Sequence, residues 1–99
     1  MFTLKLTKPA QQQFDQLKTS KHHQGIFRQV QKTLRLLSQN PRHPSLQTHK
    51  FESIQHPYVA TAPVFEAYAQ HHAPSAYRVF WCYGPDRRQI TIIAITPHP

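Results

Sequence analysis

The first residues of the chain alternate between apolar and polar side chains, which predicts a short strand. Phe2, Leu4 and Leu6 are separated by single polar residues, and a period of two is typical of a half-buried strand. Pro9 follows at a place where a helix can begin, because the first turn of a helix leaves its N–H groups unpaired and proline has none to lose. The pattern therefore predicts a strand and then a helix.

The next apolar residues recur at helical spacing and predict two helices. In the first, Phe14 and Leu17 mark a short apolar edge. The second has a longer stripe, made of Phe27, Val30, Leu34 and Leu37. The string NPRHP at residues 40–44 ends this helix, since proline disfavours helical geometry in the residue before it. We expect the two helices to form a hairpin.

Beyond the helices the pattern becomes irregular and then changes to strands. Residues 45–63 have no clear period, and their expected anchors are Leu46, Phe51, Ile54 and Tyr58. Three later segments are rich in aromatic and β-branched residues: 64–69, 76–83 and 89–95. They are separated by the turn-forming strings HHAP (71–74) and GPDR (84–87), so they predict an antiparallel meander.

Alternation within the middle strand predicts which face meets the helices. One face carries Tyr77, Val79, Trp81 and Tyr83, and the other carries Arg78, Phe80 and Cys82. The larger apolar set should pack on the helices. The expected fold is α+β: an N-terminal strand and a two-helix hairpin packed on an antiparallel sheet that a three-strand meander completes. A chain of 99 residues can bury one modest core, so we expect a single domain over residues 1–99.

The chain is strongly basic, and this narrows the class of partner. It has 12 Lys and Arg against 4 Asp and Glu, a formal net charge of +8, and eight histidines can add to this charge. A polyanion or an acidic protein is the expected partner. Cys82 is the single cysteine, and a lone thiol suits a reducing cytoplasm. No apolar run approaches the roughly 18 residues that span a bilayer, so no membrane segment is expected.

Four strings along the chain resemble those of the RelE/ParE toxin superfamily. After the second helix come NP (40–41), Leu46 and HKF (49–51), which together resemble the family's basic and hydrophobic element before the sheet. VFE (64–66) resembles the strand that follows. YRVFW (77–81) is similar to the family's tyrosine-arginine strand, and residues 90–98 are similar to its apolar last strand, which ends in a histidine. The resemblance covers essentially the whole chain.

This resemblance implies a toxin of a type II toxin-antitoxin system. Members of the RelE, YoeB and HigB type are ribosome-dependent mRNA endonucleases, and members of the ParE type poison DNA gyrase. For this chain it favours a metal-independent endoribonuclease that cuts by 2′-OH attack, with the ribosome and mRNA as targets and a cognate acidic antitoxin as inhibitor. The alternatives are a ParE-like DNA gyrase inhibitor and a degenerate member that binds antitoxin or RNA without cleavage. Fold alone does not separate them.

The resemblance assigns the expected chemistry to His98, Arg78 and Lys50. RNA cleavage without a metal needs a base for the 2′-OH proton, cations for the phosphate and an acid for the leaving 5′-oxygen. His98 matches the catalytic histidine of YoeB-like and HigB-like members; the structural alternative is a frayed terminal residue. The family often places a tyrosine beside this histidine, whereas this chain has Pro97 and Pro99 there.

Arg78 and Lys50 are the expected cations of the site. Arg78 matches the family's phosphate-binding arginine, and its fixed fork of donors suits that role. The structural alternative is an ion pair with Glu66 on the neighbouring strand. Lys50 matches the family's basic element and would stabilise the transition state or donate a proton; its alternative is a solvated loop lysine. Glu66 is a secondary candidate for the base.

Further basic residues are expected to bind the RNA backbone. They are His49, Lys32, Arg35, Arg42, Arg87 and Arg88. No metal or cofactor is expected, because the adjacent histidines at residues 22–23 and 71–72 point apart and no Cys or carboxylate cluster completes a site. Cys82 has no His and carboxylate pair to activate it, so it is predicted to be a small core residue.

Overall fold

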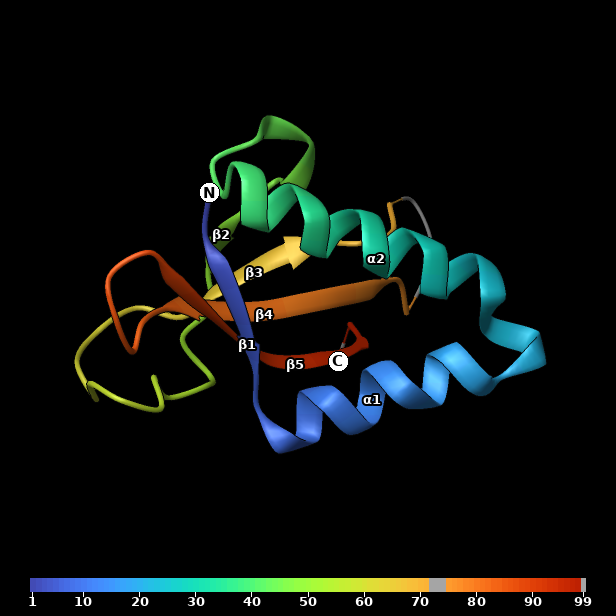
Figure 1. The fold of residues 1–99 in the computed structure, drawn as a ribbon, viewed down its shortest axis with the longest axis horizontal. Helices are drawn as coiled ribbons and strands as arrows, with labels where there is room; N and C mark the ends of the chain where they lie inside the picture. Colours follow the sequence, from blue (N-terminus) through green and yellow to red (C-terminus); the bar gives the residue numbers. More distant parts are fainter. Residues whose placement is uncertain (72–74, 99) are drawn as a thin grey trace.

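The computed structural model describes residues 1–71 and 75–98, and its elements follow the predicted order (Figure 1). The helices are α1 (Lys8–Thr19) and α2 (Gln24–Gln39), with short 3₁₀ turns at Lys21–His23 and Pro44–Leu46. The strands are β1 (Thr3–Leu6), β2 (His49–Lys50), β3 (Phe65–Tyr68), β4 (Tyr77–Tyr83) and β5 (Gln89–Pro97). The fold is α+β, as predicted. Three residues of the expected HHAP turn, 72–74, lie outside the described residues, as does Pro99.

Local signals fix the ends of the two helices. Thr7 caps α1, because its hydroxyl accepts a hydrogen bond from the N–H of Ala10 at 3.2 Å. Pro9 is the second residue of α1, so the helix begins one residue before the proline. The second helix ends where the proline-rich string begins, as predicted. Ser38 Oγ donates to the carbonyl oxygen of Phe2 at 2.7 Å, which ties the end of α2 to the chain before β1.

The five strands form one sheet in the order β1-β5-β4-β3-β2. β3, β4 and β5 form the predicted antiparallel meander, and β2 extends it at the β3 edge. β1 lies at the other edge and runs parallel to β5, with Leu4 opposite Ile90. Parallel neighbours need a long connection, which the helices and the rest of the sheet provide here. The apolar pattern predicted β1 as a strand, and we expected an antiparallel sheet; the parallel pairing of β1 with β5 makes the sheet mixed.

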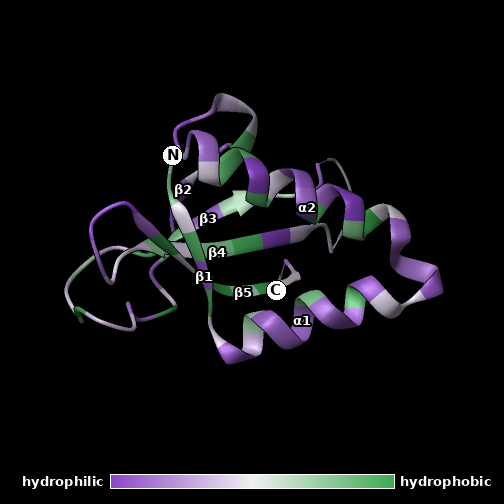
Figure 2. Ribbon diagram, viewed as in Figure 1, coloured by the Kyte–Doolittle hydropathy of each residue, from purple (hydrophilic) through white to green (hydrophobic). Residues whose placement is uncertain are grey.

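One face of the sheet packs on the helices and forms the main core. Leu17 of α1 and Val30 and Leu37 of α2 are buried in one cluster with Val79 and Trp81 of β4. This is the face that the alternation in β4 predicted. Figure 2 shows hydrophobic residues concentrated on β4 and β5, while the outer surfaces of the helices are hydrophilic.

The other face of β4 is also covered. Phe51 packs on Phe80, with ring centroids 4.7 Å apart. The long connection over residues 51–63 lies at the end of the sheet that carries the β4–β5 turn (Figure 1). Cys82, near the end of β4, is fully buried. The burial of Cys82 confirms its predicted place in the core.

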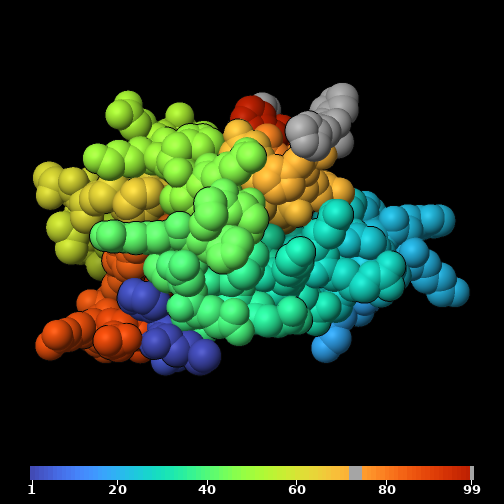
Figure 3. Space-filling view, turned by 90° about the horizontal axis from the view of Figure 1, so that it is seen from above, coloured from blue at the N-terminus to red at the C-terminus, as the bar shows by residue number. Residues whose placement is uncertain are grey.

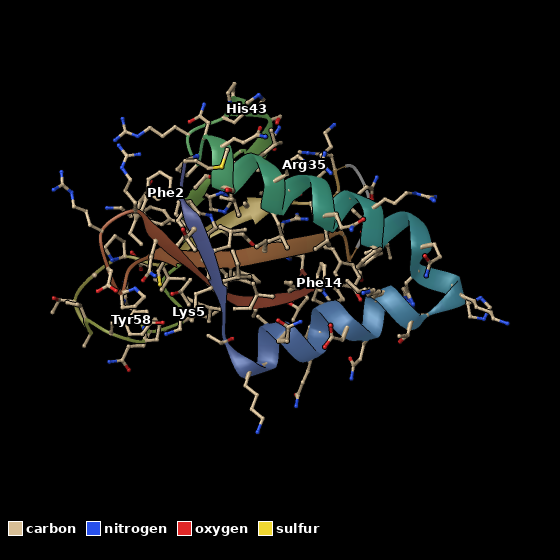
Figure 4. The ribbon with its side chains drawn as sticks, viewed as in Figure 1. Phe2, Lys5, Phe14, Arg35, His43 and Tyr58 are labelled. Carbon is tan, nitrogen blue, oxygen red and sulfur yellow. The ribbon has the colours of Figure 1, made fainter. Side chains whose placement is uncertain are left out.

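A buried histidine holds this long connection in place. His56 Nδ1 accepts hydrogen bonds from the N–H groups of Tyr58 and Val59, and His56 Nε2 lies 2.9 Å from the carbonyl oxygen of Tyr83. Tyr58 is 42% exposed and anchors the connection through its hydroxyl, which lies 3.0 Å from Thr91 Oγ1 (Figure 4). The sequence predicted only apolar anchors, so the role of His56 was missed.

β5 continues to Pro97, two residues further than predicted. Beyond it, the N–H of His98 donates to the carbonyl oxygen of Ala76 at 2.8 Å, so the backbone of His98 is still held against the neighbouring chain. Arg78 pairs with Thr96 near this end of the sheet. The β4–β5 turn lies at the opposite end (Figure 1). The long last strand therefore brings His98 to the same end of the sheet as Arg78.

Candidate active site

The carboxylate of Glu66 is the centre of a group of polar side chains at one end of the sheet. Glu66 lies in β3 and its side chain is 2% exposed. A buried carboxylate is costly unless cations or hydrogen-bond donors surround it. Among the described residues, three nitrogen-bearing side chains do so: His49, Arg78 and His98. We call these four residues the polar cluster.

His49 makes the shortest contact in the polar cluster. It pairs with Glu66 across β2 and β3, so the two side chains share a face. His49 Nε2 lies 2.6 Å from Glu66 Oε1, and His49 Nδ1 lies 3.2 Å from the carbonyl oxygen of Gln47. Both oxygens are acceptors when Glu66 is ionised, so this geometry suits an imidazolium that donates from both nitrogens. The His49 side chain is 49% exposed and can still meet a ligand.

Arg78 enters the polar cluster from β4 and is held on several sides. Its Nε lies 3.8 Å from Glu66 Oε2, so the ion pair that the sequence left open is formed. Its Nη1 donates to the carbonyl oxygen of Ala76 at 3.0 Å, and its Cζ lies 3.8 Å from the centre of the Tyr68 ring. Within residues 1–71 and 75–98, no hydrogen bond involves Nη2. This nitrogen is therefore the one placed to bind an incoming anion.

His98 completes the polar cluster from the end of β5. Its Nε2 lies 4.0 Å from Glu66 Oε2, and its side chain is 47% exposed. The backbone bond to Ala76 argues against a frayed end. Glu66 Oε2 and Arg78 Nε are both buried and make no hydrogen bond within the described chain. Catalytic groups often show such long contacts before a substrate binds.

Lys50 does not join the polar cluster. It pairs with Phe65, and neighbouring residues of a strand point to opposite faces, so Lys50 and His49 diverge. The exposed Lys50 side chain instead borders a hollow of about 500 Å³ that residues 51–56 and 60–64 also line. The register thus places His49, which we expected to bind the RNA backbone, next to the carboxylate.

The other predicted RNA-binding residues are spread over the surface. Lys32 and Arg42 are exposed, on α2 and just after this helix, and Arg35 points outward from α2 (Figure 4). Arg87 and Arg88 are exposed in the β4–β5 turn. Figure 3 shows this turn (orange-red) beside the N-terminus (blue) and away from the C-terminal end of the chain (red). These basic side chains therefore extend along the molecule instead of surrounding the polar cluster.

The described residues hold no alternative metal or thiol centre. No group of three or more His, Cys, Asp or Glu in residues 1–71 and 75–98 is placed to hold a metal ion. His22 and His23 lie in the 3₁₀ turn between the helices, and His72 of the second histidine pair is outside the described residues. Burial raises the pKa of the Cys82 thiol to about 11, which leaves little thiolate at neutral pH. No described helix is long and apolar enough to cross a membrane.

The residue that joins Arg78 to His98 is Glu66, which the sequence offered only as a secondary candidate for the base. The neighbouring Tyr68 carried no prediction. The alternation of side chains along β3 is a sequence signal for both residues, because it puts Glu66 and Tyr68 on one face. Whether that face meets Arg78 depends on the strand register, in which Tyr68 lies opposite Arg78. The register is a property of the folded sheet that a period of two does not specify.

Solved structures of similar fold are toxins. The chain is similar to a YoeB/ParE toxin from Agrobacterium tumefaciens, with a TM-score of 0.72, 9% identity and 100% of both chains covered. It is similar to a heterotetrameric YoeB-YefM toxin-antitoxin complex from Staphylococcus aureus (TM-score 0.67, 11% identity, 100% of this chain and 99% of that chain). An archaeal RelE-RelB complex from Pyrococcus horikoshii gives a TM-score of 0.65 and 15% identity over 97% and 93% of the two chains. No protein-family model matches the sequence, and no curated protein matches it significantly.

The helical hairpin packed on a five-stranded sheet is therefore a fold that this chain shares with these solved structures. More narrowly, the chain shares the fold of solved YoeB/ParE, YoeB and RelE proteins, which is the fold that the resemblance of its four strings implied. At identities of 9 to 15%, the structural similarity shows the fold alone. The activity has to be argued from the polar cluster.

Proposed function

We propose that this chain is a single-domain toxin of a type II toxin-antitoxin system and a ribosome-dependent mRNA endoribonuclease of the cytoplasm. The observation that carries the proposal is the polar cluster, which gathers two imidazoles and a guanidinium around one buried carboxylate. The net charge of +8 supports a polyanionic substrate and an acidic antitoxin. The similar solved structures include a toxin-antitoxin complex, which supports a protein inhibitor.

The polar cluster can supply each part of a metal-independent cleavage. The 2′-oxygen attacks phosphorus, the bond from phosphorus to the 5′-oxygen breaks, and a 2′,3′-cyclic phosphate and a 5′-hydroxyl form. A base takes the 2′-OH proton and an acid protonates the leaving oxygen. His98 and His49 are the two groups placed to exchange these protons, because both are about half exposed. Arg78 Nη2 stabilises the charge that develops on the phosphate.

Glu66 acts through its neighbours in this mechanism. Its side chain is 2% exposed, so RNA does not touch it. It holds His49 by the 2.6 Å contact and faces both Arg78 and His98, which makes it a positioning residue. Lys50 lies outside the polar cluster, and we assign it to RNA binding beside the cluster rather than to proton transfer.

The wide spread of basic residues over the surface supports the proposal that the toxin acts on the ribosome. The end of β4 at Tyr83 is roughly 17 Å from Arg78, at about 3.3 Å per residue, and Arg87 and Arg88 lie beyond that end in the β4–β5 turn. That separation is too large for these arginines to hold the phosphate that is cut. They are suited to bind the phosphate backbone of a second nucleic-acid segment, such as rRNA. The ribosome itself would orient the mRNA in the polar cluster.

Inducible expression in bacterial cells tests the proposed function. We expect growth arrest, mRNA breaks that map to the ribosomal A site, and no gyrase-linked DNA breaks. A ParE-like inhibitor of DNA gyrase would give the DNA breaks without the mRNA breaks. A degenerate member would give neither and would leave growth unchanged. Either of the last two results would contradict the proposal.

A further inference from the structure

Three side chains form a stack that begins in the polar cluster and ends at the surface. The Arg78 guanidinium lies over the ring of Tyr68, with Cζ 3.8 Å from its centroid. His71 stacks on Tyr68 with ring centroids 5.6 Å apart and an interplanar angle of 27°. His49 meets Tyr68 edge-on at 5.7 Å. Tyr68 is half-buried and His71 is exposed, so the stack leads outward from the polar cluster.

A hollow of about 170 Å³ lies beside this stack, between α2 and the edge of β3. Tyr68 and His71 line it on the sheet side, and Gln29, Lys32 and Ser45 are among the residues that line it on the other side. β2 pairs only with the first two residues of β3, so it does not cover the end of β3 at which Tyr68 lies. The hollow is therefore open at the edge of the sheet next to the polar cluster.

The chemistry of this hollow suits an unpaired nucleobase. Bases of single-stranded RNA stack on aromatic and imidazole rings, and a neighbouring cation stabilises both the base and its phosphate. The Gln29 amide offers a donor and an acceptor, and the Ser45 hydroxyl offers both as well. Lys32 supplies the cation. An apolar peptide side chain would leave these three polar groups without a use.

We propose that the hollow bounded by Tyr68, His71 and Lys32 binds the RNA base next to the phosphate that is cut. This inference rests on the proposed function, because Arg78 would take part in both sites. Its Nη2 would bind the phosphate, and the plane of its guanidinium packs on the ring of Tyr68. Tyr68 then fixes the distance between the phosphate and the base.

Binding of a 2′-O-methyl RNA tetranucleotide tests the subsite, because the methylated 2′-oxygen cannot attack and the probe stays intact. We expect Tyr68→Leu and Lys32→Gln each to weaken binding about tenfold in fluorescence anisotropy, the scale of one lost base stack or phosphate contact. Tyr68→Phe keeps the ring and should bind within about twofold of the wild type. Arg28→Gln is the matched control, since Arg28 is exposed on α2 and does not line the hollow.

The base preference at the cut separates this inference from the proposed function. Cleavage of mRNA on ribosomes should lose its preference for the base beside the cut in Tyr68→Leu and keep it in Arg28→Gln. If mRNA is cut and the preference survives in both Tyr68→Leu and Lys32→Gln, the subsite is wrong and the nuclease stands. If no mRNA is cut but tetranucleotide binding depends on Tyr68 and Lys32, the hollow stands as a base-binding site and the nuclease is wrong. Absence of tetranucleotide binding by the wild type overturns the subsite.

Discussion

The Glu66 carboxylate lies 2.6 Å from His49 Nε2, 3.8 Å from Arg78 Nε and 4.0 Å from His98 Nε2. Removing a carboxylate from water costs several kcal/mol unless nearby charges and hydrogen bonds offset the loss. The three side chains offset it here, and the carboxylate in turn determines where they lie. Glu66, one of four acidic residues in this basic chain, thus orients the groups to which we assign RNA cleavage.

Replacement of Arg78 by lysine should keep the fold and remove the activity. A single ammonium cannot bond the Ala76 carbonyl, face Glu66 and hold a phosphate at once, whereas the guanidinium has separate nitrogens for these contacts. We expect Arg78→Lys to lower mRNA cleavage on ribosomes by about 10²-fold or more. Arg28→Lys, on the exposed face of α2, is the control and should cut normally. Normal cleavage by Arg78→Lys would remove this arginine from the site.

Cys82 should make stability depend on pH in a known direction. Burial raises the pKa of its thiol from the ordinary 9.0 to about 11 in the folded protein. The folded state keeps the proton that the unfolded chain loses, so this contribution is complete below pH 9.0 and is lost as the pH rises from 9.0 to about 11. Denaturant unfolding should therefore show the stability advantage of the wild type over Cys82→Ala shrinking across that range. A constant difference would contradict the assignment.

At the scale of elements, the apolar periods predicted what depends on local spacing. The stripe in α2 and the alternation in β4 predicted the two surfaces that meet in the core. The same reasoning did not predict that β1 runs parallel to β5 or that His49 lies opposite Glu66. Pairing and register depend on contacts between distant segments, and a shift of one residue would exchange His49 for Lys50 beside the carboxylate.

The connection over residues 51–63 should depend on His56. Its ring satisfies the N–H groups of Tyr58 and Val59 and contacts the carbonyl oxygen of Tyr83 at the end of β4. We expect His56→Ala to lower the free energy of unfolding by about 1–3 kcal/mol, because buried backbone groups would lose their partners. His22→Ala, in the exposed turn between the helices, is the control in the same denaturant titration. Equal stability of the two variants would show that His56 is not an anchor.

At the scale of the whole molecule, the two ends of the sheet differ in what they offer a ligand. The end with His98 holds the polar cluster and the Tyr68 stack, whereas the β4–β5 turn at the other end carries exposed arginines without such a cluster among the described residues (Figure 1). We expect one end to act on the scissile nucleotide and the other to help dock the protein. The sequence could predict the net charge but not this division, because the division depends on the direction in which each strand runs.

The most direct test of the proposed nuclease is the substitution His98→Gln in cells and on purified ribosomes. The His98 side chain is 47% exposed, and its backbone N–H, which donates to the Ala76 carbonyl oxygen, is kept in glutamine, so Gln should leave thermal stability nearly unchanged. Cleavage of mRNA in the ribosomal A site should fall by about 10²- to 10⁴-fold, the usual scale for loss of one positioned acid or base. Growth arrest should be relieved accordingly. Fully arrested cells with unchanged A-site breaks would contradict the account and move the proton transfer away from His98.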